Sequence, residues 1–478
     1  MIFIIFAAFI IYNVNSVRVP PNFKFGIATS AYQVEGGWNA SGKGENVWDR
    51  LMHTRPDLIF DHTNGDVACD SYHKWREDVE ILKTLGVDYY RFSISWSRVL
   101  PTGFGNKINP DGIRYYSDLI DELLKNGIEP FVTIFHWDLP QPLQDLGGWT
   151  NPQIALYFED FARVVFEHFG DRVKKWITIN EPSSICYGTY GRGLYLPFEY
   201  PGIGDYLCGK TLLLAHARAY HLYDNEFREK QHGKIGITID STWAEPKTNN
   251  KKDVMAAERE MQMGTGWWMH PIFSKEGDYP EILKFRVAEI SKTENFPESR
   301  LPPLDQEEIK FIRGSADFLG LNHYLTYLVS DNELNTNVKT SLEKDRGTKN
   351  EVDPNWDNPL ITPWGMRKLI NWLANEYDNP IIYITENGYW DDGRLDDQDR
   401  IKFYKGYIKA VLDAAVVDKC NVRGYITWSI MDNMEWRVGY KFKYGLYHVD
   451  FQSPNRTRTP KVSAKFYQDV IKNRYLPE

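Results

Sequence analysis

Two glutamates follow short apolar runs, at places where a pair of carboxylates could act together. Glu386 lies in the segment PIIYITENGY (380–389), and Glu181 lies in KWITINEP (175–182). Each run is typical of a strand buried on both faces, which ends where a glycine or Pro182 interrupts it. A lone glutamate after a strand is more often a solvated loop residue. Two of them at the carboxyl ends of buried strands suit the chemistry that hydrolyses a glycosidic bond.

The segments that must position these glutamates alternate between strand and helix. Eight apolar runs are expected to be strands, at residues 23–33, 87–96, 129–137, 175–182, 234–243, 317–324, 380–388 and 422–432. Helices are expected at residues 70–86, 111–127, 152–169, 210–231, 364–377, 399–417 and 460–473, the last beginning with Pro460. Parallel strands need such crossovers, so the sequence predicts an α/β fold, a single (β/α)8 TIM barrel with long βα loops. A doubly wound sheet is disfavoured because no G-x-G-x-x-G turn follows the first strand.

In such a barrel, the polar residues at the strand ends converge on one mouth. They are Gln33, Arg91, His136, Trp137, Asn180, Glu181, Asn322, His323, Tyr324, Glu386, Asn387, Trp428, Glu435 and Trp436. Amides, carboxylates and aromatic rings together suit the hydroxyls and flat faces of a sugar. The set contains no cluster with metal-ligand spacing and no G-x-S-x-G elbow, and one arginine is little for a phosphate site.

Composition limits the number of domains and the kinds of partner that the chain can have. The chain has 478 residues, of which 42% are hydrophobic and 15% aromatic, so a large core is easily built. No linker, repeat or low-complexity tract divides it, which predicts one catalytic domain over residues 17–478. The net charge of −9 argues against nucleic acid and anionic membranes as partners.

Residues 1–16, MIFIIFAAFIIYNVNS, contain an apolar run that is too short to span a bilayer and fits the core of a secretory signal peptide. It lacks the usual basic residue at its start. We therefore expect cleavage near Ser16 and a secreted protein, in the gut lumen or another extracellular or secretory compartment. In such a compartment, Asn39 and Asn455 would be glycosylation acceptors, because each begins an N-x-S/T motif.

The cysteines Cys69, Cys186, Cys208 and Cys420 form neither a disulfide scaffold nor a metal-binding pattern. Cys186 and Cys208 flank one loop. Both a disulfide and a pair of unlinked buried thiols fit this spacing.

Several longer motifs occur in order: FGIATSAYQVEG, YRFSISWSRVLP, HWDLPQPLQDLGGW, TINEP, ITENG and WSIMDNMEW. With them the chain resembles the glycoside hydrolase family 1 β-glucosidases, most closely the secreted insect members of the β-glucosidase and myrosinase group. The resemblance runs from about residue 22 to residue 461. It implies hydrolysis of terminal non-reducing β-D-glucosides through a covalent glycosyl-enzyme, with retention and without a metal or organic cofactor. A small-molecule β-glycoside would be the partner.

The matching motifs also imply residue roles. Glu386 resembles the family's nucleophile and Glu181 its acid/base, while Arg91 and Tyr324 resemble the groups that hydrogen-bond the nucleophile. The residues that resemble sugar ligands are Gln33, His136, Asn180, Trp428, Glu435 and Trp436. Taken singly, an arginine, histidine or tryptophan of this kind is as often structural. The two glutamates at strand ends favour the site interpretation.

The chain departs from the common pattern around the sugar. Met434 stands where phenylalanine is usual, and Lys443-Tyr444 replaces Arg-Phe. Neither change removes a catalytic group, but both bear on the choice among glucose, galactose and fucose. Trp356 is a candidate aromatic gate for the leaving group.

Three alternative functions are consistent with the same resemblance. An insect thioglucosidase (myrosinase) acting on glucosinolates would be expected to place basic residues near the aglycone sulfate, where this chain has Tyr187 and Tyr327. Nothing in the sequence shows that Arg192 or Arg346 substitutes for them from loops, so this alternative lacks support and a generic aryl- or alkyl-β-glucosidase is favoured. A transglycosylase would use the same catalytic residues. A non-catalytic binding module is disfavoured because both glutamates are present.

Overall fold

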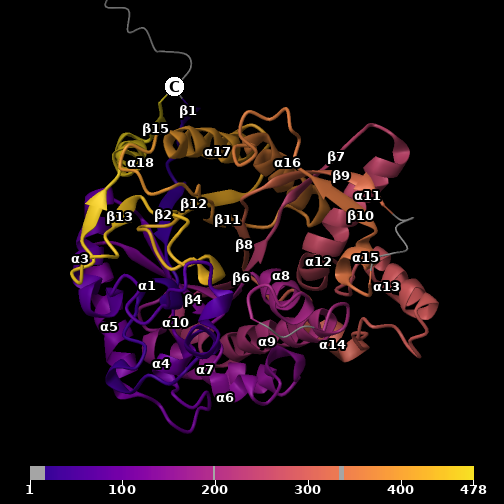
Figure 1. Cartoon of the computed structure of the whole chain (residues 1–478), viewed down its shortest axis with the longest axis horizontal. Coiled ribbons are helices and arrows are strands. Elements are labelled where there is room, and N and C mark those ends of the chain that lie inside the picture. Colours follow the sequence, from indigo (N-terminus) through magenta and orange to yellow (C-terminus); the bar gives the residue numbers. More distant parts are fainter. Residues whose placement is uncertain (1–16, 197–199, 333–338, 478) are drawn as a thin grey trace, which may run out of the picture.

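The computed structural model describes residues 17–196, 200–332 and 339–477. At its centre, eight parallel strands form a closed barrel, with helices packed around it (Figure 1). The strands are β2 (Lys24–Ala28), β3 (Tyr89–Ser93), β4 (Glu129–Phe135), β5 (Lys175–Asn180), β6 (Lys234–Asp240), β8 (Phe318–Asn322), β11 (Ile382–Glu386) and β12 (Val422–Trp428). β12 pairs with β2 and closes the barrel. The predicted TIM barrel is confirmed.

A helix follows each barrel strand before the next begins. These helices are α3 (Ser71–Leu85), α5 (Pro110–Lys125), α7 (Ile154–Phe169), α9 (Gly204–Glu226), α14 (Gln306–Ile312), α16 (Pro363–Glu376), α17 (Gln398–Val416) and α18 (Val462–Asn473). α5 shows why they form, since Asn109 caps its first turn, Pro110 opens it, and its buried residues recur at helical spacing. The expectation that Pro460 opens the last helix was wrong. Pro460 instead ends β14 (Arg458–Pro460), which pairs with β13 (Tyr447–Val449), and α18 starts two residues later.

Four aromatic rings fill the end of the barrel where the strands begin. Tyr89, Phe131, Phe318 and Tyr383 contact one another edge to face, with ring centroids 5.4 to 6.3 Å apart. Edge-to-face contacts of this kind pack a barrel interior tightly. Because this end is filled, a cavity can form only at the opposite end, where the strands finish.

Longer connections build up the mouth. The segment between β6 and β8 contains β7 (Trp243–Pro246), α11 (Lys251–Met261), α12 (Trp267–Phe273) and α13 (Glu281–Thr293). β9 (Thr326–Asp331) and β10 (Thr348–Glu351) join β7 in a three-stranded sheet beside the barrel (Figure 1). α15 (Leu342–Arg346) lies between β9 and β10 in the chain.

The described chain is tied together at its two ends. β1 (Val17–Arg18) pairs with β15 (Tyr475–Leu476). The predicted signal segment, residues 1–16, lies outside the described residues. Within the described ranges, no helix has the length and apolar character needed to cross a membrane.

Candidate active site

A cavity of about 810 Å³ occupies the mouth of the barrel, and both glutamates line it. The residues with a predicted sugar-binding or supporting role that line it are Gln33, His136, Tyr324, Trp428, Glu435 and Trp436, and Trp137 and Asn322, predicted at the mouth without a role, line it as well. Arg91 and Asn180 are fully buried beside it and contact the lining residues. The structure therefore brings together the ten residues with a predicted catalytic, sugar-binding or supporting role, from seven barrel strands and the segments that follow them.

Glu386 ends β11 with both carboxylate oxygens hydrogen-bonded. Arg91 Nη1 donates to its Oε1 at 2.5 Å, and the Tyr324 hydroxyl donates to its Oε2 at 2.8 Å. A bond from a charged donor is short and directional. Glu386 is thus held in one orientation at the floor of the cavity.

Arg91 is itself fixed by the barrel wall. It lies on β3, where its Nε donates to Thr133 Oγ1 at 3.2 Å and its Nη2 donates to Asn180 Oδ1 at 2.6 Å. Its Nη1 also donates to the carbonyl of Thr385, the residue before Glu386. A buried guanidinium with all its bonds to neighbouring strands has one orientation, which in turn sets the position of Glu386.

Glu181 is placed differently. It follows β5 in the left-handed backbone region, with φ of 52°, and its Oε1 accepts from Asn322 Nδ2 at 2.7 Å. Burial first, then the charges of Glu386 and Asp240, raise the pKa of Glu181 well above its usual value. Among the residues that the structure describes, no cation forms an ion pair with this carboxyl. Glu181 therefore carries a proton under conditions in which a solvated glutamate would not.

Asn180 links the two carboxylates to a histidine. Its Oδ1 accepts from Arg91 and from Asn322, so its Nδ2 must point the other way, toward His136 Nε2 at 3.1 Å. An amide nitrogen only donates, so Nε2 accepts and the imidazole is neutral. Burial and the nearby Arg91 charge agree with this, because they lower the pKa of His136 well below its usual value.

Gln33 and Glu435 form a second polar group on the cavity wall. The sequence predicted Gln33 at a strand end, and this prediction was wrong. Gln33 lies on α1 (Ala31–Val34), because β2 ends at Ala28. Its Nε2 donates to Asn433 Oδ1 at 3.0 Å and to Glu435 Oε2 at 3.1 Å. Burial and the Glu386 charge raise the pKa of Glu435 to about 8, so its carboxyl is mostly protonated near neutral pH.

Tryptophans provide an aromatic surface beside these polar groups. Trp428 and Trp436 both lie nearly parallel to the His136 ring, with centroids 5.9 and 6.0 Å away. Trp137 packs on Trp436 at 4.6 Å and donates from its Nε1 to the carbonyl of Asn180. Gly388 is required here, since a Cβ on it would lie 2.1 Å from the carbonyl oxygen of Trp428.

Some residues of the mouth have a strained backbone. Three residues of the site, Trp137, Glu181 and Trp436, have φ values of 76°, 52° and 50°. Such conformations are costly for residues other than glycine and persist where the surrounding structure enforces them.

The sequence interpretation missed two neighbours of Glu181. Asn322 was placed at the mouth but given no role, although it donates to Glu181 and lies opposite Asp240 in the β6–β8 ladder. Asp240 lines the cavity, accepts from Ser184 Oγ at 3.1 Å, and has a pKa raised to about 6, mainly by burial. Its position at the end of an apolar run was the signal that could have found it.

Trp356 was proposed as a gate for the leaving group, and the structure does not bring it to the cavity lining. Its ring packs edge to face against Trp364 on α16, with centroids 5.7 Å apart. On the leaving-group side the lining includes the tyrosines 187 and 327 and the arginines 192 and 346.

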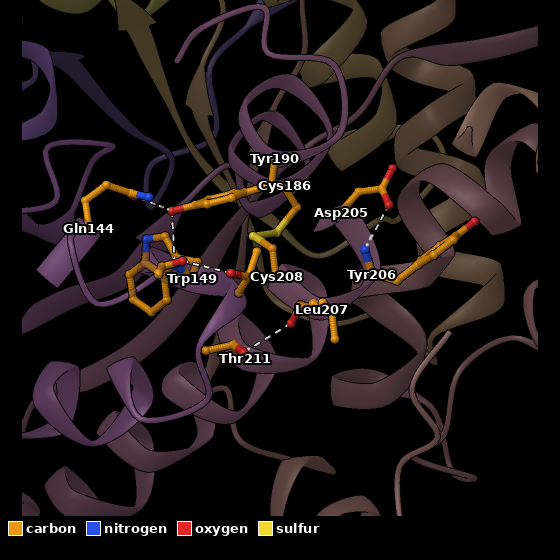
Figure 2. The surroundings of a disulfide bond; sticks show 11 residues. Gln144, Trp149, Cys186, Tyr190, Asp205, Tyr206, Leu207, Cys208 and Thr211 are labelled. Carbon is orange, nitrogen blue, oxygen red and sulfur yellow. Dashed lines mark hydrogen bonds between the residues drawn. A yellow bond between two sulfur atoms is a disulfide. The ribbon is translucent and has the colours of Figure 1, made fainter. Parts of the chain in front are cut away.

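A disulfide fixes the segment that follows Glu181. Cys186 and Cys208 are bonded, with Cα atoms 5.4 Å apart, and join η4 (Cys186–Gly191) to α9 (Figure 2). Next to it, the Tyr190 hydroxyl donates to Gln144 Oε1 at 2.8 Å and accepts from the Trp149 amide at 3.0 Å (Figure 2). Of the two possibilities that the spacing allowed, the structure shows the disulfide.

Comparisons with known proteins show which family the chain resembles over its length. The model of Glycosyl hydrolase family 1 matches residues 15–475. The chain is 49% identical over 462 residues to Myrosinase 1 of Brevicoryne brassicae, across 95% of this chain and 98% of that protein. It is 43% identical over 464 residues to a cytosolic beta-glucosidase of Homo sapiens, across 96% and 98%. A solved structure of an aphid myrosinase superposes with a TM-score of 0.92 at 48% identity, across 95% of this chain and 99% of that one. The chain therefore belongs to glycosyl hydrolase family 1 and is a glycoside hydrolase.

Proposed function

We propose that the protein is a retaining β-glucosidase in which Glu386 is the nucleophile and Glu181 the acid/base. The observation that supports this most is the contrast between the two carboxylates in one cavity. Glu386 is hydrogen-bonded by a cation and a phenol, whereas Glu181 is buried, has no ion pair with any described residue, and has a raised pKa. An acid and a nucleophile need such different surroundings.

In the first step, Glu386 attacks the anomeric carbon while Glu181 protonates the glycosidic oxygen. The bond from the anomeric carbon to that oxygen breaks, and the aglycone leaves as an alcohol. The sugar is then esterified to Glu386, so the negative charge that raised the pKa of Glu181 is gone. That pKa falls, which prepares Glu181 to act as a base.

In the second step, Glu181 removes a proton from water as the water oxygen attacks the anomeric carbon. The ester bond to Glu386 breaks, and Glu386 returns to the carboxylate form that Arg91 and Tyr324 hold. Two inversions at one carbon leave the configuration unchanged, so the first product is the β-anomer. An alcohol in place of water would give transglycosylation by the same route.

The remaining residues would bind the sugar. Asn180, whose Oδ1 and Nδ2 are oriented by Arg91 and His136, would bind the 2-hydroxyl, a contact that strengthens in the transition state. Gln33, His136 and Glu435 would bind the other hydroxyls, with Trp428 and Trp436 against the ring face. A protonated Glu435 can both donate to and accept from a hydroxyl.

We also infer that the protein is secreted. The Cys186–Cys208 disulfide supports this, because such bonds persist in oxidising compartments and are rare in the cytosol. Asn39 and Asn455 are both exposed, as glycosylation acceptors must be. Mass spectrometry of the protein from its native source would test this through the N-terminal residue and the two asparagines.

A trapping experiment tests the catalytic roles. The purified enzyme would be treated with a 2-deoxy-2-fluoro-β-glucoside, and the labelled peptide identified by mass spectrometry. We expect the label on Glu386, and we expect proton NMR of early hydrolysis to show the β-anomer of glucose first. A label on another residue, or α-glucose as the first product, would refute the assignment.

A further inference from the structure

Arg437 joins three separate segments at the mouth of the barrel. It lies in η6 (Trp436–Val438) and lines the cavity with a partly buried side chain. Its Nε donates to the carbonyl of Leu58 at 3.0 Å. Its Nη1 donates to the carbonyls of Gly193 and Leu194 at 3.0 and 2.7 Å. Hydrogen bonds from a charged donor are the stronger kind, and a planar guanidinium gives several of them in a fixed geometry.

The residues that Arg437 reaches lie on the leaving-group side of the cavity. Because Glu181 would donate its proton to the departing oxygen, the loop that follows Glu181 forms the wall against which the leaving group lies. Leu194 and Tyr195 belong to this loop and line the cavity. The Tyr195 ring packs on that of Trp137, with centroids 4.9 Å apart. Residues 193–195 therefore supply an aromatic contact on this side.

Residues 193–195 have few other supports. Their amides donate to the carbonyls of Gly188 and Thr189 in η4, at 2.6 to 3.2 Å. Such local bonds shape the loop without fixing it to the opposite wall of the cavity. Among the described hydrogen bonds, those that reach residues 193–195 from outside this loop come from Arg437. Leu194 is 46% exposed and adds little packing.

The opposite wall, residues 435–439, is fixed by contacts that do not involve the guanidinium. We call it the sugar-binding wall. The amide of Glu435 donates to the last carbonyl of this segment at 2.7 Å, and the amide of Phe60 donates to the carbonyl of Arg437 at 2.8 Å. The Trp436 ring packs on two further tryptophan rings, with centroids 4.6 and 4.7 Å away. Without its guanidinium, Arg437 would leave this wall in place and release the leaving-group side.

We propose that Arg437 is a positioning residue that holds residues 193–195 against the sugar-binding wall and thereby sets the affinity for a leaving group that carries a ring. This inference rests on the proposed β-glucosidase activity, and it concerns the fit of the leaving group rather than the bond-breaking steps. The ring of Tyr195 is the group that such a leaving group would contact. A wall that is already in place loses little entropy when the leaving group binds, whereas a loose wall must be ordered at that moment.

Matched substrates separate the two sides of the cavity. Ethyl β-glucoside and 2-phenylethyl β-glucoside both release a primary alcohol, and they differ in the phenyl ring that would reach residues 193–195. Glucose release gives kcat and KM for each. The inhibition constant of 1-deoxynojirimycin, a glucose mimic without a leaving group, reports on the sugar side alone. The wild-type enzyme should have the lower KM for the substrate with the ring.

Arg437→Met keeps an unbranched side chain but removes all three hydrogen bonds. We expect KM for 2-phenylethyl β-glucoside to rise by about 10-fold with a smaller change in kcat, because the contact that is weakened is a binding contact. KM for ethyl β-glucoside and the inhibition constant of 1-deoxynojirimycin should stay within about threefold of the wild-type values. Arg437→Lys keeps the charge but loses the fork of donors, so its constants should lie closer to those of Arg437→Met than to the wild type.

Arg474→Met is the matched control. Arg474 is also partly buried, and its Nη2 donates to the carbonyls of Pro20 and Phe23 at 2.6 and 2.7 Å. Phe23 directly precedes β2, so this arginine joins segments at the end of the barrel where the strands begin. Both Met variants should lower the Tm, whereas Arg474→Met should keep every kinetic constant within about twofold of the wild type because its site is distant from the cavity.

The outcomes separate this proposal from the proposed function. The role of Arg437 would be overturned by a wild-type KM that gains nothing from the phenyl ring, by an equal loss on both substrates, or by the same rise in KM for Arg474→Met. If Arg437→Met does not fold, Arg437→Lys carries the same test. Inactivity of the wild-type enzyme on every β-glucoside, aryl glucosides included, would instead overturn the proposed function.

Discussion

At the scale of single residues, the site works by giving two glutamates different surroundings. Arg91 and Tyr324 donate to Glu386, while Glu181 receives one amide hydrogen bond and is otherwise buried near negative charge. The raised pKa of Glu181 depends on the charge of Glu386. The roles of the two residues are therefore coupled, and chemistry at one changes the proton affinity of the other.

This coupling gives a pH prediction. Glu181 acts as an acid only when protonated, so kcat/KM should fall as the pH rises through its raised pKa. Esterifying Glu386 removes the neighbouring charge, so the pKa of Glu181 should then drop toward the ordinary value of a glutamate. Carbon NMR of labelled glutamates, before and after trapping with a fluorinated glucoside, measures both values, with Glu181→Gln to assign the signal. Equal values in the two states would contradict the coupling.

Tyr324 gives a second prediction at this scale. Tyr324→Phe removes the donor to Glu386 Oε2 without changing the ring that packs against Tyr444. A hydrogen bond to a charged group contributes about 1.5–3 kcal/mol, so kcat should fall by about 10- to 100-fold. Steady-state kinetics on an aryl β-glucoside measures this. Tyr327→Phe, a cavity tyrosine on β9 without a contact to either glutamate among the described bonds, should retain nearly full kcat.

At the scale of elements, the loop after Glu181 needs its own support. It leaves β5 through a left-handed glutamate, forms the short helix α8 (Pro182–Ile185) and η4, and carries several cavity residues. The disulfide joins it to α9, and Tyr190 joins it to the β4–α7 connection. These two contacts hold the leaving-group side of the cavity against the barrel.

Replacing the disulfide by two serines (Cys186→Ser with Cys208→Ser) should therefore lower both stability and affinity. A cross-link that closes a loop of this length contributes about 3 kcal/mol in the chain-entropy model. The free energy of unfolding should fall by that order, and KM for a bulky aglycone should rise more than kcat falls. Urea denaturation and steady-state kinetics measure the two effects. Cys420→Ser, which removes an unlinked thiol, is the control, and identical behaviour of the two variants would refute the supporting role.

At the scale of the whole molecule, the C-terminal segment is bonded to the active-site wall. Asp432 lies between β12 and Glu435, and Lys461, just before α18, donates to it at 2.7 Å with both side chains fully buried. His448 Nδ1 lies 3.2 Å from the other oxygen of Asp432. This buried pair ties the end of the chain to the segment that carries Glu435 and Trp436.

The pair predicts a dependence of stability on pH. Although burial opposes it, His448 and Lys461 together lower the pKa of Asp432 below its usual 3.8. A carboxyl whose pKa is lower in the folded state stabilises the fold at pH values above its pKa in the unfolded state. That stability is lost as the pH falls through its pKa in the folded state. The Tm gap between wild type and Asp432→Asn should thus be constant from pH 6 to about pH 4 and narrow below. Asp57→Asn, which removes one partner of an exposed surface ion pair, should have almost the same Tm as the wild type at every pH. A gap for Asp432→Asn that does not narrow in acid would contradict the assignment.

Breaking the same pair from the other side gives a separate prediction. Lys461→Met leaves the Asp432 charge buried without its cation, which typically costs about 3–5 kcal/mol. Calorimetry should show a lower Tm, and the activity lost at moderate temperature should return on cooling. Unchanged stability would mean that the pair is not what anchors the C-terminal segment.

Local pattern was sufficient for the barrel and for most site positions. Strand ends recur wherever an apolar run meets a polar residue, as at Glu386 and Asp240, because a buried parallel strand cannot continue into solvent. Local pattern was insufficient for Gln33, which the sequence placed at a strand end and the structure places on α1. A residue that lies one turn beyond a strand looks the same in sequence as one at its end.

The sequence by itself determined the eightfold alternation and the two glutamates at the carboxyl ends of β5 and β11, because the periodicity and chain breaks that specify them are local. Only the tertiary structure decided which side chains from distant loops meet. The disulfide, the Asn322 contact to Glu181 and the position of Trp356 are of this kind. Each depends on the way in which the long connections fold back over the barrel. Those paths are set by packing between segments far apart in the chain rather than by the pattern of any one segment.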